Sequence, residues 1–129
     1  MERRERPQGT GSAEELEVIH DRARVAAMAA VGVKADEVKI LDMHELVSYT
    51  DYLVLATGRN TRLTKRIAEE VAFKLKAEAG LLPMGVEGTG GEWVLLDFVD
   101  FVVHVFTPEA REFYRLDVLW KQAPVEVVQ

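Results

Sequence analysis

The chain has 129 residues, a usual length for one domain with a single hydrophobic core. Hydrophobic residues make up 48% of it and charged residues 29%, which excludes the composition of a disordered protein. The net charge of -6 disfavours nonspecific binding to nucleic acid, and the absence of cysteine excludes disulfides, thiolate catalysis and cysteine-ligated metals.

The first eleven residues combine charge, proline and glycine with almost no apolar side chain. Ordering such a segment recovers little free energy, so we expect residues 1–11 to form a flexible tail. Its arginines, Arg3, Arg4 and Arg6, are not followed by an apolar run that could act as a secretion signal or a membrane span. We therefore expect a cytoplasmic protein that does not cross a membrane.

The first predicted helix begins at a capping box formed by Ser12 and Glu15. Apolar residues then recur at helical spacing as far as Ala30, and Gly32 follows. This pattern predicts a helix over about residues 13–30.

Two strands and a long helix are predicted next. The first strand is short, about residues 38–42, and the second covers about residues 51–57. The second is apolar almost without alternation, which is typical of a central strand covered on both faces. Gly58 then breaks the chain, and a helix with one apolar stripe runs from there to Gly80.

The second half of the chain predicts three more strands, at residues 83–87, 92–96 and 101–107. The glycine-rich turn of residues 88–91 and the short connection after the fourth strand indicate antiparallel hairpins. Pro108 suits the first turn of one last helix, because its missing N–H is not needed there.

The predicted order of elements indicates an α/β protein. We expect residues 12–123 to form a three-layer α/β domain with a five-stranded mixed sheet and helices over both faces. Residues 124–129 are expected to be a flexible C-terminal tail.

Gly58 lies between a strand and a helix, where free N–H groups and the helix dipole favour an anion. This arrangement raises the alternative hypothesis of a nucleotidyl- or phosphate-transfer enzyme, with Asp51 nearby. No GxGxxG or GKT pattern is present, and no Asp-x-Asp pair could hold divalent ions, so a tight turn at Gly58 is the favoured interpretation. We expect no catalytic residue, no metal site and no cofactor.

Trp93 begins a strand directly after the glycine-rich turn, so its ring either closes the core or is half exposed to a partner. Seven acidic residues and only two arginines lie between residues 87 and 117. Such a charge run is often a plainly solvated surface, but an apolar anchor within it suits a basic protein partner. The predicted partner-binding residues are Glu87, Trp93, Asp97 and Asp100.

His104 lies within an apolar strand, and no nucleophile or ligand-spaced histidine neighbours it in sequence. A hydrogen-bonded structural histidine is therefore favoured over a general base. The last helix carries more large apolar area than is needed to cover one sheet face, and part of it is either shared with a second chain or used for ordinary docking. These dimer or partner interface candidates are Tyr114, Leu116, Leu119 and Trp120.

Four stretches, taken in order, are TDYLVLATG, RLTKRIAEEV, GLLPMGVEG and GEWVLLDFVDFVVHVFTPEAREFYRLDVLW. Together they resemble the ribosomal silencing factor family, also called the Iojap-like or RsfS family, over about residues 36–123. The resemblance implies a nucleotidyltransferase-like fold that lacks the metal-binding carboxylates.

The same resemblance implies a function. Members are understood to bind large-subunit ribosomal protein fourteen on the large ribosomal subunit, to block subunit joining and so to repress translation under nutrient limitation. It also implies a homodimer when the protein is free. From the acidic net charge we expect no direct sequence-specific contact to nucleic acid. A dimeric scaffold without a ribosomal role is a third possibility.

Overall fold

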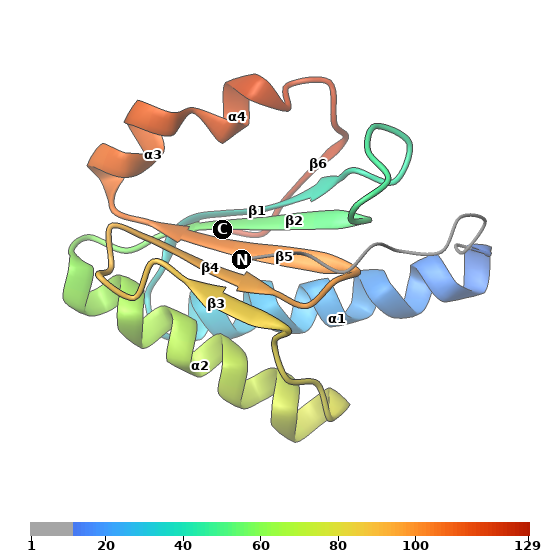
Figure 1. Ribbon diagram of the computed structural model, residues 1–129, viewed down its shortest axis with the longest axis horizontal. Helices are drawn as coiled ribbons and strands as arrows, with labels where there is room; N and C mark the ends of the chain where they lie inside the picture. Colours follow the sequence, from blue (N-terminus) through green and yellow to red (C-terminus); the bar gives the residue numbers. More distant parts are fainter. Residues whose placement is uncertain (1–11) are drawn as a thin grey trace.

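The computed structural model describes residues 12–129, so the predicted tail of residues 1–11 lies outside the described residues. The elements follow the order α-β-β-α-β-β-β-α-α-β along the chain (Figure 1). Their bounds are α1 Ala13–Gly32, β1 Asp36–Asp42, β2 Tyr52–Thr57, α2 Thr61–Ala79, β3 Gly85–Glu87, β4 Trp93–Asp97, β5 Phe101–Phe106, α3 Pro108–Tyr114, α4 Leu116–Leu119 and β6 Val125–Val127. Within this part of the chain no helix is long and apolar enough to cross a membrane.

The strands form one mixed sheet in the order β3-β4-β5-β2-β1-β6. β2 and β5 are parallel, and every other neighbouring pair is antiparallel. Figure 1 shows α1 and α2 on one face of this sheet and α3 and α4 on the other. The mixed α/β architecture with helices on both faces is thus confirmed, and the likeness to nucleotidyltransferases stays a prediction.

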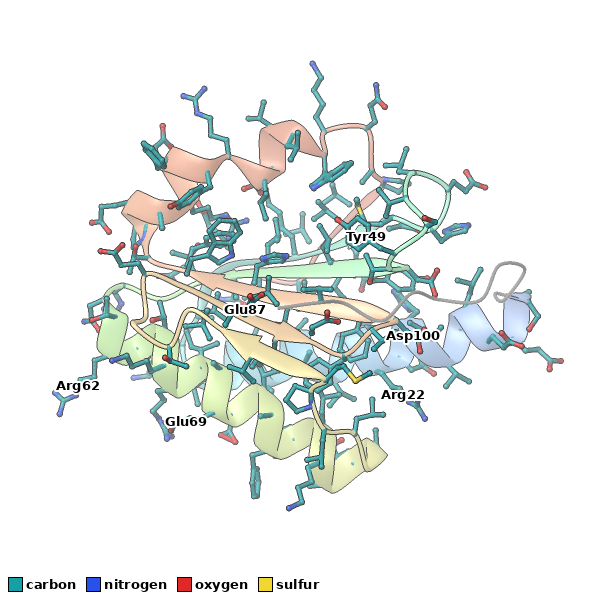
Figure 2. All side chains as sticks on the ribbon, in the orientation of Figure 1. Arg22, Tyr49, Arg62, Glu69, Glu87 and Asp100 are labelled. Atoms are coloured by element: carbon teal, nitrogen blue, oxygen red, sulfur yellow. The ribbon has the colours of Figure 1, made fainter. Side chains whose placement is uncertain are left out.

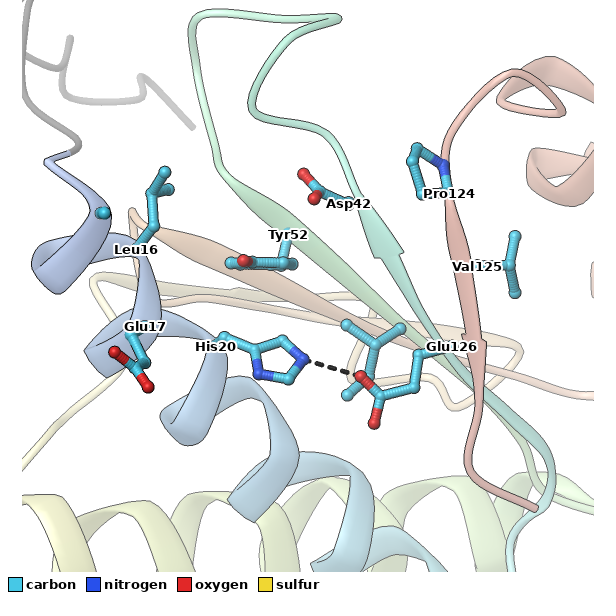
Figure 3. A pocket seen from close by; sticks show the side chains of 10 residues that line it. Leu16, Glu17, His20, Asp42, Tyr52, Pro124, Val125 and Glu126 are labelled. Atoms are coloured by element: carbon cyan, nitrogen blue, oxygen red, sulfur yellow. Dashed lines mark hydrogen bonds and ion pairs between the residues drawn. The ribbon is translucent and has the colours of Figure 1, made fainter.

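The sheet has six strands, so the prediction of five was wrong. The additional strand β6 comes from the segment 124–129, which was predicted to be a flexible tail, and it pairs with the outer edge of β1. Glu126 of β6 also accepts a 2.7 Å hydrogen bond from His20 (Figure 3). It lies 3.2 Å from the guanidinium of Arg24 as well. Pairing with the edge strand β1 and these contacts to α1 keep residues 124–129 in place. Their apolar pattern is too short to predict a strand from the sequence.

The last helix is broken in two at Arg115, whose φ of 53° lies in the left-handed region. The break lets Asp117 reach back to Arg111, which donates hydrogen bonds of 3.1 and 2.9 Å to both carboxylate oxygens. Arg111 is buried and also donates to the carbonyl oxygen of Glu37 at 2.7 Å and to the hydroxyl of Thr57 at 2.9 Å. One guanidinium therefore joins α3, α4, β1 and β2.

Gly58 follows β2 and donates its N–H to the carbonyl of Phe106 at 2.8 Å. A Cβ at this position would lie 2.9 Å from the backbone nitrogen of Thr64 and 3.1 Å from Cδ1 of Ile67. Asn60 caps the helix by accepting a hydrogen bond from the N–H of Leu63 at 2.9 Å. Gly58 is therefore required by the close approach of β2 to α2.

Replacing Gly58 with alanine forces backbone and side chains apart in this contact. We expect Gly58→Ala to lower the free energy of unfolding by roughly 1–3 kcal/mol, measured by urea denaturation. Gly90→Ala is the matched control, because nothing lies within 4 Å of a Cβ at Gly90. Equal stability of the two variants would contradict this packing role.

Candidate functional site

Trp93 is positioned by the tight turn that precedes β4. Gly88 has a φ of 77°, and a Cβ there would lie 1.7 Å from the carbonyl oxygen of Trp93, so no other residue fits. Gly91 closes the turn by donating its N–H to the carbonyl of Gly88 at 2.9 Å. The turn delivers Trp93 to the α3 side of the sheet, where its side chain is half-buried.

Aromatic rings form a continuous row from β5 through Trp93 to the surface of α3. The centroid of Trp93 lies 5.2 Å from that of Phe106 and 4.4 Å from that of Tyr114. Tyr114 in turn contacts Phe113 at a centroid distance of 5.0 Å. Tyr114 is 49% exposed and Phe113 79% exposed. We call Trp93, His104, Phe106, Phe113 and Tyr114 the aromatic row.

His104 anchors the buried end of this row. Its Nδ1 accepts a 2.8 Å hydrogen bond from Nε1 of Trp93, and its ring lies 5.7 Å from the indole. Burial lowers the pKa of His104 to about 4, so the ring is neutral at pH 7 and can accept this bond. The predicted hydrogen bond of His104 is confirmed.

Of the three carboxylates predicted to bind a partner, only Glu87 is exposed to solvent on the sheet face that carries the aromatic row. Glu87 is exposed, and it pairs across β3 and β4 with Leu95, whose side chain is on the same face as Trp93. Exposed Glu92 directly precedes Trp93.

Asp97 and Asp100 lie at the other end of β4 from Trp93, and Figure 2 shows Asp100 well separated from Glu87. Asp97 is only 2% exposed, and its carboxylate accepts a 2.7 Å hydrogen bond from the N–H of Val99. Its place in the predicted docking surface was wrong, because it is a turn-forming residue. Asp100 is half-buried in the same turn.

The predicted interface residues of the last helix divide into two groups. Leu116 and Trp120 are half-buried and pack on the core cluster beneath α3 and α4, so they mainly cover the sheet. Tyr114 and Leu119 are exposed, and Leu119 exposes 63% of its area. With exposed Phe113 and Val118 they form what we call the α3–α4 apolar surface, defined as Phe113, Tyr114, Val118 and Leu119.

The glycine-rich turn packs against the N-terminus of α2, which is the basis of the phosphate-transfer hypothesis. The Gly91 backbone lies against Thr61, since a Cβ on Gly91 would be 2.8 Å from that of Thr61. The hydroxyl of Thr64 donates to the carbonyl of Gly91. Asp51 precedes β2, at the opposite end of the strand from Gly58. No group of three His, Asp or Glu side chains in residues 12–129 could hold a metal ion.

The depressed pKa of His104 makes stability depend on pH. Between pH 6.5 and about 4 the unfolded chain carries a proton on His104 that the folded protein lacks, so stability falls as the pH falls through this window. We expect a loss of up to about 1.4 kcal/mol per pH unit, measured by urea denaturation at pH 7, 6 and 5. The excess slope should vanish in His104→Gln, whose amide oxygen can still accept from Trp93; an unchanged slope would contradict the assignment.

A protein-family model described as "Ribosomal silencing factor during starvation" matches residues 16–129. The ribosomal silencing factor of Chromobacterium violaceum is 39% identical over 103 residues, which span 79% of this chain and 84% of that protein. The factor of Zymomonas mobilis is 36% identical over 88 residues, which span 67% of this chain and 65% of that protein.

A solved structure supports the same relationship. The crystal structure of a Chromobacterium violaceum protein superposes with a TM-score of 0.77 at 37% identity, covering 86% of this chain and 92% of that one. The family model extends through β6, so the match includes the strand that the sequence pattern missed. The curated relatives are named for silencing ribosomes, which is a regulatory role. This chain belongs to the ribosomal silencing factor family.

Proposed function

We propose that this protein represses translation by binding the large ribosomal subunit through large-subunit ribosomal protein fourteen and sterically blocking subunit joining. Family membership supports the ribosomal role. The main support for the proposed docking surface is the aromatic row, in which Trp93 is half-buried and already oriented by His104. No bond needs to be made or broken for such a block.

The aromatic row suits a protein partner on energetic grounds. Tryptophan and tyrosine are enriched among the residues that dominate binding energy, especially where their rings are held rigid before binding. Trp93 is fixed by its hydrogen bond to His104 and by its contact with Tyr114, so little side-chain entropy is lost on docking. We therefore place Trp93 and Tyr114 at the centre of the docking surface.

Charge supports a basic partner. Glu87 and Glu92 are exposed near Trp93, and Glu109 and Glu112 are exposed on α3. Carboxylates at the rim of an interface raise the association rate with a cationic protein and make it sensitive to salt. These residues replace Asp97 and Asp100 as the acidic part of the proposed surface, because Asp97 is buried and Asp100 lies at the far end of β4.

We also propose that the free protein forms a homodimer through the α3–α4 apolar surface. Four large apolar side chains are exposed on eleven residues of α3 and α4, more than scattered surface residues require. Tyr114 belongs both to this surface and to the aromatic row, so we expect dimerisation and ribosome binding to compete.

Trp93→Ala tests the docking surface. We expect it to raise the Kd for purified large subunits at least about tenfold, because a central aromatic anchor contributes about 2 kcal/mol or more. Co-sedimentation with separated large and small subunits measures this, and circular dichroism checks the fold. Phe73→Ala removes an exposed ring from α2, on the opposite face of the sheet, and should bind as the wild type does.

Trp93→Phe guards against loss of folding in the alanine variant, since it keeps an aromatic ring at this position while it removes the N–H donor and part of the apolar area of the indole. We expect intermediate affinity. If folded Trp93→Ala and Trp93→Phe both bind large subunits with the wild-type Kd, Trp93 is not part of the docking surface.

Leu119→Asp tests the dimer. Its exposed position predicts an intact monomer whose dimer dissociates at least about tenfold more readily, because a carboxylate would be buried without a partner. Sedimentation equilibrium over a range of protein concentrations measures this. Leu82→Asp is the matched control, as Leu82 is 69% exposed and lies outside α3 and α4. Equal dissociation in the two variants would place the dimer interface elsewhere.

A further inference from the structure

Four cations cluster at the start of α2 although the whole protein is acidic. Arg59, Arg62, Lys65 and Arg66 fall within eight residues, and all are exposed. Figure 2 shows Arg62 extending from this end of α2 away from the body of the protein. We call these four residues the basic edge.

The basic edge does not stabilise the helix that carries it. The N-terminus of a helix bears partial positive charge, so cations there are unfavourable, and α2 has no acidic residue in its first turn. No residue in the described range 12–129 forms a salt bridge with any of the four. Glu69 and Glu70 stand four residues after Lys65 and Arg66 on α2, but neither forms an ion pair with them. These exposed side chains are therefore available for a contact outside the fold.

The basic edge adjoins the proposed docking surface. Gly91 lies against Thr61 at the start of α2 and accepts a hydrogen bond from Thr64. Trp93 follows Gly91 by two residues, which span about 7 Å in an extended chain. A partner that covers Trp93 therefore comes close to the basic edge at the same end of the sheet.

We propose that the basic edge binds phosphates of the large subunit's ribosomal RNA beside the protein surface on which the aromatic row docks, which rests on the proposed function. Guanidinium and ammonium groups bind phosphate oxygens through charge-assisted hydrogen bonds. Such contacts release counterions and read no sequence. The protein would therefore bind the assembled subunit more tightly than the isolated ribosomal protein, because only the assembled subunit offers RNA phosphates.

The test compares two double variants with the same change in charge. Arg62→Gln with Arg66→Gln removes two cations from the basic edge, and Lys74→Gln with Lys76→Gln removes two exposed cations from the other end of α2. The Kd of each is measured for intact large subunits and for isolated large-subunit ribosomal protein fourteen, between 50 and 200 mM salt. Melting temperature is recorded for all proteins.

We expect the basic-edge variant to bind intact subunits more weakly than the wild type does. The salt slope, which is the slope of log affinity against log salt concentration, should be smaller in magnitude by about 2. The ratio of wild-type to variant affinity should therefore fall about tenfold between 50 and 200 mM salt. The variant's affinity for the isolated ribosomal protein should equal that of the wild type, and its Tm should be equal or higher. The Lys74 and Lys76 variant should match the wild type with both probes.

Two results would overturn the inference. One is an unchanged salt slope on intact subunits. The other is an equal loss of affinity for the isolated ribosomal protein, which would make the basic edge a protein contact. Failure of the wild type to bind the isolated ribosomal protein would instead overturn the proposed docking partner, because the salt slope on intact subunits would still test the basic edge.

Discussion

The parallel pairing of β2 with β5 is the constraint on which the rest of the structure depends. Every residue of both strands is buried, so both faces of the sheet must be covered over its centre. On one face α1 and α2 provide this cover, and α1 can approach closely because its buried side chains include five alanines, Ala23, Ala26, Ala27, Ala29 and Ala30. On the other face the cover is two short helices, and it is incomplete.

The incomplete cover explains why the aromatic row is accessible. α3 has seven residues and α4 only four, and they are held over β1 and β2 by Arg111, whose bond also keeps the pKa of Asp117 below its usual value. This position leaves β3 without a helix above it on that face (Figure 1). At the start of β4, Trp93 packs against Tyr114 of α3. Trp93 is consequently packed on one side and open on the other, as a docking residue must be. A longer straight helix would bury more apolar area but would also cover the proposed surface.

The sequence predicted most of this fold because the local signals were strong. Ser12 and Asn60 cap the two long helices, and Gly80 ends α2 in the left-handed conformation. It did not predict β6 or the break at Arg115, because both depend on contacts between residues far apart in the chain, such as Glu126 with α1 and Arg111 with β1. The sequence predicted a role for Trp93 in binding. It could not distinguish a turn-forming carboxylate such as Asp97 from an exposed one, because the positions of acidic residues in a sequence do not show which side chains are buried.

Net charge is a poor guide to what this protein binds, because charges farther apart than about 8 Å are largely screened at physiological salt. The value of -6 opposes nucleic acid only on average. Within a Debye length of an approaching surface, the charges that count are the carboxylates around Trp93 and the cations from Arg59 to Arg66. A ribosomal surface also juxtaposes opposite charges, basic protein and phosphate, at short range. Under the proposed function, a docking face with both signs in adjacent positions would match such a mosaic better than it would match a uniformly basic protein or bare RNA.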